Sequence, residues 1–413
     1  MCKPLHDIQT RIVIGSVPKD GGTFTFYRSL RDLLLKHGMH LHCVSVGRRE
    51  SRLREAAFAD DGCILLAPDV ADVKEQSIAF VDWCEREAVD IVIGLNSIAI
   101  LSALPHLPER VRVISRCANA FDHGYRITMS GRERLARMIV TTPRLKTDLV
   151  NHYGADESQI ELLPNGISPG CFDAAARVSR GTNEVLRLGF LGRLEHNQKG
   201  VFYLPKILRC LKQRGVRFQL RIAGKGVHRN ALENALKEWV NNGEVVFVGA
   251  LQPSQVPAFF EDTDLYLFTS RFEGCPNALL EAMMAGCVPI SWTIDGITDF
   301  IVEDGRTGSL SPIEDYVDFA DNIATLDRDR ARLQRISESA AATARDRFSS
   351  ERAAATYAEV FREVMQKPPP SWRPRPWDEF LVDQSFVETW PQRIAQPVKS
   401  LAKYILSLRR RVA

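Results

Sequence analysis

The 413-residue sequence contains no C-x-x-C pair, because its nine cysteines are scattered along the chain. Disulfide-rich secreted domains and structural zinc sites both need closely spaced cysteines, so the sequence fits neither class. It also lacks an uncharged apolar run of about 18 residues, the length that a membrane-spanning helix requires. Residues 1–10 are short of apolar side chains, so we expect no signal peptide there. Together these absences predict a protein of the reducing cytoplasm.

Charge of one sign is not in excess either. The 54 lysines and arginines nearly balance 51 aspartates and glutamates, which leaves a formal net charge of +3. A nucleic-acid-binding surface needs clustered positive charge, so we expect no nucleic acid as a partner. With 45% hydrophobic and 25% charged residues, the composition is that of an ordinary folded protein and argues against extended disorder.

Short apolar strands alternate with helical segments along most of the chain, a pattern typical of parallel sheets covered by helices. The alternation begins with an expected strand at 11–17 and restarts with one at 185–191, after turn-rich residues at 163–167. A chain of 413 residues also exceeds the size at which one core usually stops growing. We therefore predict an α/β protein with two doubly wound, Rossmann-like domains, residues 1–168 and 183–350, that face a cleft.

Residues 351–413 are expected to form a C-terminal segment that packs back on the first domain. A helix is predicted to about residue 365, and it is then interrupted by the proline-rich run at 367–377, KPPPSWRPRPW. This run is interpreted as an extended strap, with a polyproline recognition motif as the alternative. Residues 397–411 place apolar side chains at helical spacing before three arginines. That helix could dock on the protein or make peripheral contact with the cytoplasmic face of the inner membrane.

The stretch Arg271–Pro289 (RFEGCPNALLEAMMAGCVP) is the most informative part of the sequence. Pro276 suits the first helical position, because its backbone angle fits there and its missing N–H needs no partner. Gly286 suits a left-handed stop, so a helix is predicted from Pro276 to about Ala285. The first N–H groups of such a helix are unpaired and favour an anion such as phosphate. These amides would belong to Asn277, Ala278 and Leu279.

Two glutamates flank the start of this helix. Glu273 lies in the loop before it, and Glu281 lies on the helix itself. In an alternative interpretation, Ser270 and Glu273 form an ordinary capping box and Glu281 is a solvated helical residue. Gly274 and Pro276 argue against that capping box, since both would fall in the first two turns of its helix.

Two basic residues and a glycine follow expected strands. Arg193 and Lys199 come after the strand at 185–191, where they could neutralise a diphosphate opposite a helix N-terminus. The alternative is that both are surface charges on a loop. Gly22 follows the first strand, where close backbone approach to a phosphate requires a residue without a side chain. A simple turn explains Gly22 equally well, and the G-x-G-x-x-G spacing of dinucleotide sites is absent.

The sequence contains one candidate element for a metal site and one candidate catalytic imidazole. Asp262-Thr263-Asp264 resembles the D-x-D element by which some sugar-transferring enzymes hold a metal, but it directly precedes an expected strand. No further carboxylate or histidine cluster lies nearby, so we predict no metal. His123 follows the fifth strand of the first half, where loops face the cleft, and could contact a sugar or move a proton. A capping or packing role is the alternative for His123.

In combination these motifs resemble those of family 4 glycosyltransferases, which have the GT-B fold. The resemblance is close over about a third of the chain, from about Leu188 to Ser309. Its motifs are GFLGRLEHNQKG at 189–200, RIAGKG at 221–226, VVFVGAL at 245–251, E-x7-E from Glu273 to Glu281, and GRTG at 305–308. LPNGI at 163–167 also matches.

The resemblance implies a role for each site residue. Arg193 and Lys199 would hold the donor diphosphate together with the backbone of residues 277–279. Glu281 would accept hydrogen bonds from the ribose, and Glu273 would bind hydroxyls of the donor sugar. Gly22 would bring the first domain's backbone to the phosphates when the cleft closes.

The implied activity is retaining, metal-independent sugar transfer. The co-substrate would be a nucleotide-diphosphate sugar, with no other cofactor, and the acceptor a carbohydrate or lipid-linked molecule in cell-surface polysaccharide assembly. Fixed arginine, lysine and helix dipoles can stabilise a departing diphosphate. Two alternatives stay open: a non-catalytic nucleotide-sugar-binding subunit, and another GT-B enzyme such as a nucleotide-sugar epimerase or a phosphorylase.

The first domain departs from the family pattern. Many members have a histidine after the fifth strand, whereas this chain has Arg116-Cys117-Ala118-Asn119, with His123 further on. His123 could substitute, Arg116 or Asn119 could take part, or the donor phosphate itself could accept the acceptor's proton.

Overall fold

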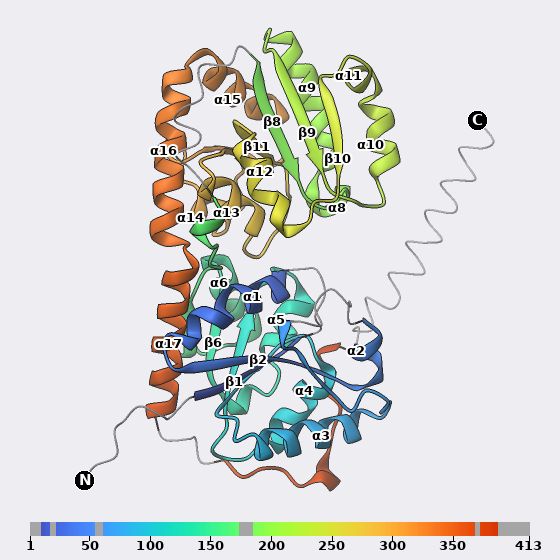
Figure 1. Ribbon diagram of the computed structural model, residues 1–413, viewed down its shortest axis with the longest axis vertical. Helices are drawn as coiled ribbons and strands as arrows, with labels where there is room; N and C mark the ends of the chain where they lie inside the picture. The colour runs from blue at the N-terminus through green and yellow to red at the C-terminus, as the bar shows by residue number, and fades with distance from the viewer. Residues whose placement is uncertain (1–9, 17–21, 54–60, 173–184, 368–371, 387–413) are drawn as a thin grey trace, which may run out of the picture.

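The structure is a computed structural model that describes residues 10–16, 22–53, 61–172, 185–367 and 372–386. It has the predicted architecture of two parallel-sheet α/β domains, one above the other in Figure 1. The predicted helix at 397–411 and residues 368–371 of the expected strap lie outside the described residues. None of the described helices combines the length and the apolar character that crossing a membrane requires.

The first domain is built on a seven-stranded parallel sheet with strand order β3-β2-β1-β4-β5-β6-β7. Its strands are β1 (Thr10–Gly15), β2 (Met39–Val46), β3 (Ile64–Leu66), β4 (Ile91–Gly94), β5 (Arg112–Cys117), β6 (Leu135–Val140) and β7 (Ile160–Leu162). Its helices are α1 (Gly22–Leu35), α2 (Gly47–Leu53), α3 (Val73–Arg86), α4 (Ile98–Ala103), α5 (Asp122–Thr128) and α6 (Pro143–Tyr153). Along β1, Ile12 and Ile14 join the core on one face and Val13 joins the core on the other. Burial on both faces explains the unbroken apolar runs.

The second domain repeats this arrangement with a six-stranded parallel sheet of order β10-β9-β8-β11-β12-β13. Its strands are β8 (Leu186–Leu191), β9 (Phe218–Ala223), β10 (Val245–Gly249), β11 (Leu265–Phe268), β12 (Val288–Trp292) and β13 (Ser309–Ser311). Its helices are α8 (His196–Lys199), α9 (Leu204–Gln213), α10 (Arg229–Ala235), α11 (Lys237–Asn241), α12 (Val256–Glu261), α13 (Asn277–Met284), α14 (Thr298–Ile301), α15 (Tyr316–Arg328) and α16 (Arg330–Arg347).

Two local interpretations need correction. Pro276 is the N-cap of α13 and has extended backbone angles, so the first helical residue is Asn277. No helix begins at Ser270, which excludes the alternative capping box. Gly286 has φ of +71° after the end of α13, as expected for a left-handed stop.

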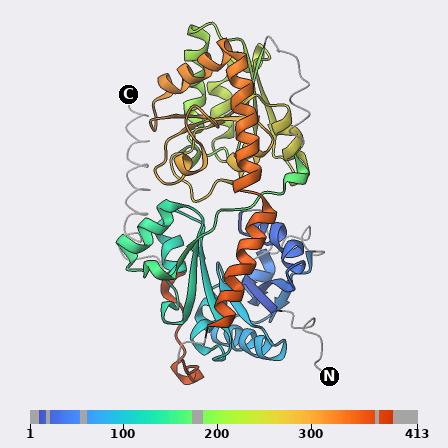
Figure 2. The same ribbon diagram turned by 90° about the vertical axis from the view of Figure 1, so that its left-hand side faces the viewer.

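The chain crosses between the domains at two neighbouring segments. The Ile167 amide donates to the Phe348 carbonyl at 2.8 Å, and the Ser350 amide donates to the Ile167 carbonyl at 2.9 Å. A Cβ on Gly166 would lie 2.7 Å from Ser350 Cα, so only glycine permits this approach. Helix α17 (Ser350–Gln366) then continues beyond α16 along the side of both domains (Figures 1 and 2). We call the residues 163–167 and 348–350 the hinge.

The described C-terminal residues lie against the first domain. Helix α17 shares a core with α1. Residues 372–386 then run along the outside of the domain, where the Arg375 amide donates to the Pro105 carbonyl at 2.9 Å. The Trp377 ring stacks on His106 with their centroids 4.2 Å apart.

Candidate active site

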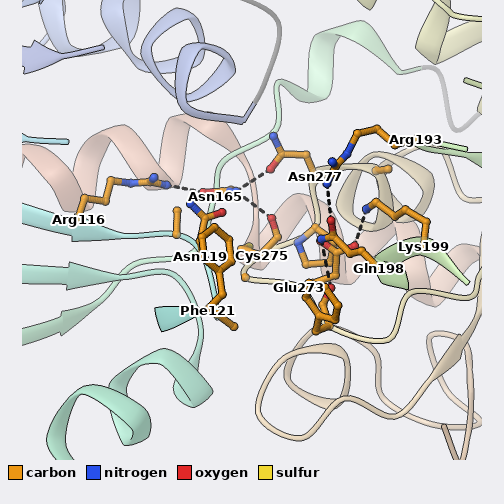
Figure 3. A pocket seen from close by; sticks show the side chains of 16 residues that line it. Arg116, Asn119, Phe121, Asn165, Arg193, Gln198, Lys199, Glu273, Cys275 and Asn277 are labelled. Atoms are coloured by element: carbon orange, nitrogen blue, oxygen red, sulfur yellow. Dashed lines mark hydrogen bonds and ion pairs between the residues drawn. The ribbon is translucent and has the colours of Figure 1, made fainter. Parts of the chain in front are cut away.

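A cleft of about 300 Å³ lies between the two domains (Figure 3). Residues of the first domain, the hinge and the second domain all contribute to its lining. They are Arg116, Ala118–Phe121, Asn165, Arg193, Gln198, Lys199 and Phe272–Ala278. The cleft therefore collects segments that are far apart in the sequence.

The topology of the second sheet explains why Arg193 and Glu273 meet. Strands β8 and β11 are neighbours in the sheet, although β8 leads on to β9 on its other side. The strand order therefore reverses between β8 and β11. In open parallel sheets, ligands bind beyond the carboxyl ends of the strands at the position where the strand order reverses. The loop after β8 carries Arg193 and Lys199, and the loop after β11 carries Glu273. The cleft lies at this predicted position.

Glu273 is held by two polar side chains from the loop after β8. Its side chain is 9% exposed and forms an ion pair with Lys199. Gln198 Nε2 donates to Glu273 Oε2 at 3.3 Å, while Gln198 Oε1 accepts a hydrogen bond from Arg193. The structure thus joins Arg193, Lys199 and Glu273 into one network. Gln198, which links them, was not singled out from the sequence.

The N-terminus of α13 borders the same cleft. Asn277 and Ala278 line it, and their amides have no hydrogen-bond partner among the described residues. The Leu279 amide, in contrast, donates to the Pro276 carbonyl at 3.1 Å, and the Leu279 side chain is buried. The expectation of three free amides is therefore corrected to two. Two unpaired amides beside Arg193 and Lys199 suit an anionic group.

Glu281 lies further along α13 and does not line the cleft. It is half-buried, and its carboxyl group has no hydrogen-bond or ion-pair partner in the described part of the chain. Burial raises the pKa of this carboxyl to about 7. A half-buried acceptor of this kind is available to hydroxyl donors from a ligand.

Asn165 in the hinge connects three parts of the molecule. Its Oδ1 accepts a hydrogen bond of 2.5 Å from Arg116 Nη2, and its Nδ2 donates to Asn277 Oδ1 at 2.6 Å. Asn165 Nδ2 also donates to the Cys275 carbonyl at 3.2 Å. Arg116 Nε in turn donates to the Tyr357 hydroxyl on α17 at 3.0 Å. The sequence showed Asn165 only as part of a turn, so this connecting role was missed.

The two domains touch where the family histidine was expected. A Cβ on Gly274 would lie 1.9 Å from the Ala118 carbonyl oxygen, so residue 274 must lack a side chain. Thr142 Oγ1 also donates to the Gly274 carbonyl at 3.1 Å. The backbone of the second domain therefore packs directly on the loop after β5.

The environment of His123 differs from the predicted one. Helix α5 begins at Asp122, and the His123 ring hydrogen-bonds through Nδ1 to the Ser385 carbonyl of the C-terminal segment at 3.1 Å. His123 is not among the residues that line the cleft. The expectation that its imidazole faces the cleft is therefore corrected, because the side chain belongs to the first turn of α5 and faces residues 383–386 instead. Gly22 lies at the start of α1, directly after residues 17–21, which are outside the described residues.

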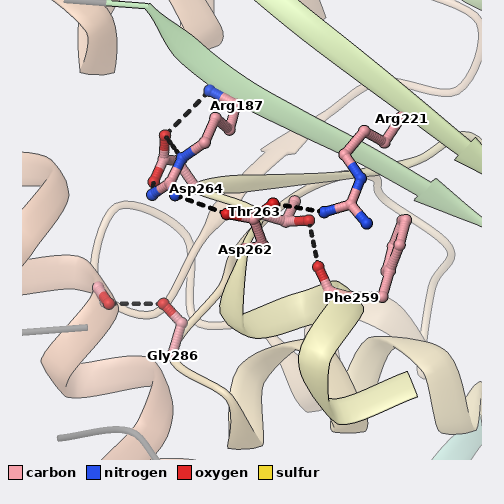
Figure 4. A network of polar contacts seen from close by, with 8 residues as sticks. Arg187, Arg221, Phe259, Asp262, Thr263, Asp264 and Gly286 are labelled. Atoms are coloured by element: carbon pink, nitrogen blue, oxygen red, sulfur yellow. Dashed lines mark hydrogen bonds and ion pairs between the residues drawn. The ribbon is translucent and has the colours of Figure 1, made fainter. Parts of the chain in front are cut away.

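The two carboxylates of the D-x-D sequence have structural partners (Figure 4). Asp262 pairs with Arg187 at 2.9 Å and with Arg221 at 2.6 Å, and Asp264 pairs with Arg187 at 2.6 Å. Asp264 Oδ2 also accepts a hydrogen bond from the Arg187 amide at 2.9 Å. These contacts join the beginnings of β8 and β11, at the edge of the sheet away from the cleft. They support the interpretation of this sequence as a turn and the start of a strand.

Comparisons with known proteins show what the second domain is similar to. Residues 186–329 match the family model described as Glycosyl transferases group 1. This group 1 match contains Arg193, Lys199, Glu273 and Glu281. The chain is 31% identical to a D-inositol 3-phosphate glycosyltransferase of Pseudarthrobacter chlorophenolicus, over 55% of this chain and 57% of that protein. It is 28% identical to a 2-deoxystreptamine glucosyltransferase of Streptomyces kanamyceticus, over 41% of this chain and 45% of that protein. The chain thus spans about half the length of these curated relatives.

Solved structures support the fold over both domains. A glycosyltransferase from Rickettsia africae superposes with a TM-score of 0.72 at 14% identity, covering 87% of this chain and 100% of that one. HepE of Anabaena, solved in complex with UDP and glucose, superposes with a TM-score of 0.68 at 16% identity, covering 86% and 100%. The chain therefore has the GT-B fold that was predicted.

Proposed function

We propose that this protein is a retaining glycosyltransferase that moves a sugar from a nucleotide-diphosphate sugar to a carbohydrate or lipid-linked acceptor. One observation carries the proposal: Arg193, Lys199 and the free amides of α13 surround Glu273 in a single cleft between the domains. Three sources of positive potential would bind the diphosphate, and a carboxylate beside them would bind hydroxyls of the donor sugar. The group 1 match of the same domain supports this assignment.

The chemistry follows from the charge that develops during transfer. When the bond between the anomeric carbon and the diphosphate breaks, the departing oxygen gains negative charge. Fixed cations and amides stabilise that charge without reorganising, and such a contact is typically worth a factor of about 100 or more in rate. We propose that this stabilisation comes from Arg193, Lys199 and α13 and needs no metal. The carboxyl group of Glu281 would accept hydrogen bonds from the ribose.

No histidine is among the residues that line the described cleft. We therefore propose that the donor phosphate accepts the proton of the acceptor hydroxyl, and His123 has no part in this scheme. The same observation favours the second candidate, a non-catalytic nucleotide-sugar-binding subunit. A cell-surface polysaccharide pathway remains the proposed context.

The proposal is tested by binding and turnover with Glu273→Gln. Binding of UDP, GDP, ADP and dTDP is first measured by thermal shift, since a ligand selective for the folded state raises stability with its affinity. The sugars of the nucleotide that binds are then tested. Glu273→Gln should weaken binding of the nucleotide sugar and abolish sugar transfer, while binding of the nucleoside diphosphate is retained. Equal loss of both affinities would contradict the placement of Glu273 at the sugar, and tight binding without any donor consumption would favour the non-catalytic subunit.

A further inference from the structure

Two aromatic side chains stand out by their exposure. Phe121 is 45% exposed and Phe272 is 36% exposed, whereas every other phenylalanine, tyrosine or tryptophan whose side chain the structure describes is less exposed. Both line the interdomain cleft. Single exposed apolar residues are common on protein surfaces and need no explanation. Here, however, Phe121 and Phe272 share one cavity.

The two rings come from opposite domains. Phe121 belongs to the loop after β5, and Phe272 belongs to the loop after β11, immediately before Glu273. The loops are in contact, because the Ala118 carbonyl oxygen would lie 1.9 Å from a Cβ on Gly274. Figure 3 shows Phe121 on the side of the first domain, next to Asn119. A ligand in the cleft would therefore meet an aromatic ring from each domain.

Polar groups lie beside these rings. Asn119 is exposed in the cleft, and its side-chain amide has no partner among the described residues. Glu273, the proposed contact of the donor sugar, lines the same cleft from the second domain, directly after Phe272. An aromatic face is electron-rich and attracts C–H groups, whereas an amide both donates and accepts hydrogen bonds. A pyranose ring matches this combination, since it has a face of C–H groups and a rim of hydroxyls.

We propose that Phe121 and Phe272 form the acceptor subsite and hold a pyranose ring of the acceptor, with Asn119 bonding its hydroxyls. This inference rests on the proposed function and adds the chemical class of the acceptor's reacting end. A nucleobase fits the position less well, because the proposed ribose contact Glu281 lies further along α13 and outside this cleft. A lipid chain fits the lining less well, because Arg193, Lys199 and Glu273 are charged.

The test uses saturation-transfer NMR on the full chain. The probes are methyl pyranosides of glucose, galactose, mannose and N-acetylglucosamine, each added with a saturating amount of the nucleoside diphosphate that binds. Phe121→Ala and Phe272→Ala are compared with Leu35→Ala and Val240→Ala. Leu35 is 44% exposed in the first domain and Val240 is 39% exposed in the second, so each control removes a similarly exposed apolar side chain that does not line the cleft. Replacement of each phenylalanine by tyrosine or leucine separates an aromatic face from simple apolar volume.

We expect signals from ring C–H protons of at least one glycoside in the wild type. Its affinity should fall about tenfold in both alanine variants, which is the size expected for one aromatic contact. The two controls and both tyrosine variants should bind as the wild type does. All variants should keep the melting temperature of the wild type, because the replaced side chains are exposed.

Four outcomes would overturn the inference. The first is the absence of any glycoside signal in the wild type, and the second is that the alanine variants bind the glycoside as their controls do. The third is that the leucine variants bind the glycoside as well as the tyrosine variants do. The fourth is that the alanine variants lose affinity for the nucleoside diphosphate and not for the glycoside. The third outcome would indicate an apolar tail, and the fourth a nucleobase. A wild type that binds no nucleoside diphosphate would instead overturn the proposed function itself, and with it the inference.

Discussion

Asn165 Nδ2 donates a hydrogen bond of 2.6 Å to Asn277 Oδ1, which ties the hinge to the first residue of the proposed phosphate-binding helix. The Asn165 Oδ1 atom of the same side chain accepts a hydrogen bond from Arg116 at the end of β5. A change at the hinge would therefore alter the position of α13 relative to the first domain. This relationship makes Asn165 a positioning residue in the proposed mechanism.

Replacement of Asn165 should weaken nucleotide binding without unfolding the protein. Asn165→Ala removes all its bonds, whereas Asn165→Asp keeps an acceptor for Arg116 and loses the donor to Asn277. If the bond to Asn277 is the important one, both variants should lose affinity for the nucleoside diphosphate by roughly fivefold, as expected for about 1 kcal/mol per hydrogen bond. Calorimetric titration measures this, with the exposed Asn241→Ala as control. Normal affinity in Asn165→Asp would show that the Arg116 contact suffices.

Lys199 should affect both stability and turnover, and a double variant separates the two effects. Lys199→Met leaves the Glu273 carboxylate buried without its cation, which we expect to lower the free energy of unfolding by on the order of 3 kcal/mol. Turnover should fall about 100-fold or more through loss of a phosphate contact. Lys199→Met with Glu273→Gln should recover the stability and remain inactive.

Urea unfolding and initial rates provide these two measurements for the Lys199 variants. Lys212→Met is the control, because its ion pair with Glu238 is exposed and such pairs are worth about 1 kcal/mol or less. Near-normal turnover in Lys199→Met would remove Lys199 from the diphosphate site.

Glu281 should make stability depend on pH. Burial raises the pKa of its carboxyl to about 7 from an ordinary value of 4.5. The folded protein therefore binds more protons than the unfolded chain between these values, so this group makes the protein less stable as pH rises through that window. Glu281→Gln should abolish the dependence and be more stable than the wild type at pH 8, by about 1–3 kcal/mol. Chemical unfolding at several pH values tests this; parallel stability curves for the two proteins would contradict it.

Asp264 should matter for stability and not for turnover. Asp264→Asn weakens the contacts to Arg187 that join the beginnings of β8 and β11, so we expect a loss of about 1–3 kcal/mol in the free energy of unfolding. Turnover of the folded variant, and of the wild type with a chelator, should stay close to normal. Asp32→Asn, at an exposed aspartate, is the matched control for stability. Loss of turnover that a divalent ion restores would return the D-x-D carboxylates to a role in metal binding.

The sequence alone determined the fold and indicated which loops of the second domain line the candidate site. Apolar runs of strand length alternate with helical segments, and this local pattern is sufficient to predict two parallel sheets. The loops after β8 and β11 were recognised because their short motifs use local chemistry, namely glycine, proline and basic residues at the ends of strands. The start of α13 was placed within one residue, and the error concerned only whether Pro276 belongs to the helix.

Only the tertiary structure decided the contacts between distant segments. The Arg116–Asn165–Asn277 connection joins three parts of the chain, and no local pattern indicates that they meet. The orientation of His123 depended on residues 383–386, which lie far along the chain and pack on α5. The exposure of Phe121 and Phe272 likewise depended on which neighbours cover each ring. Local propensities set the elements, whereas side-chain partners and solvent exposure arise only when the domains and the C-terminal segment pack together.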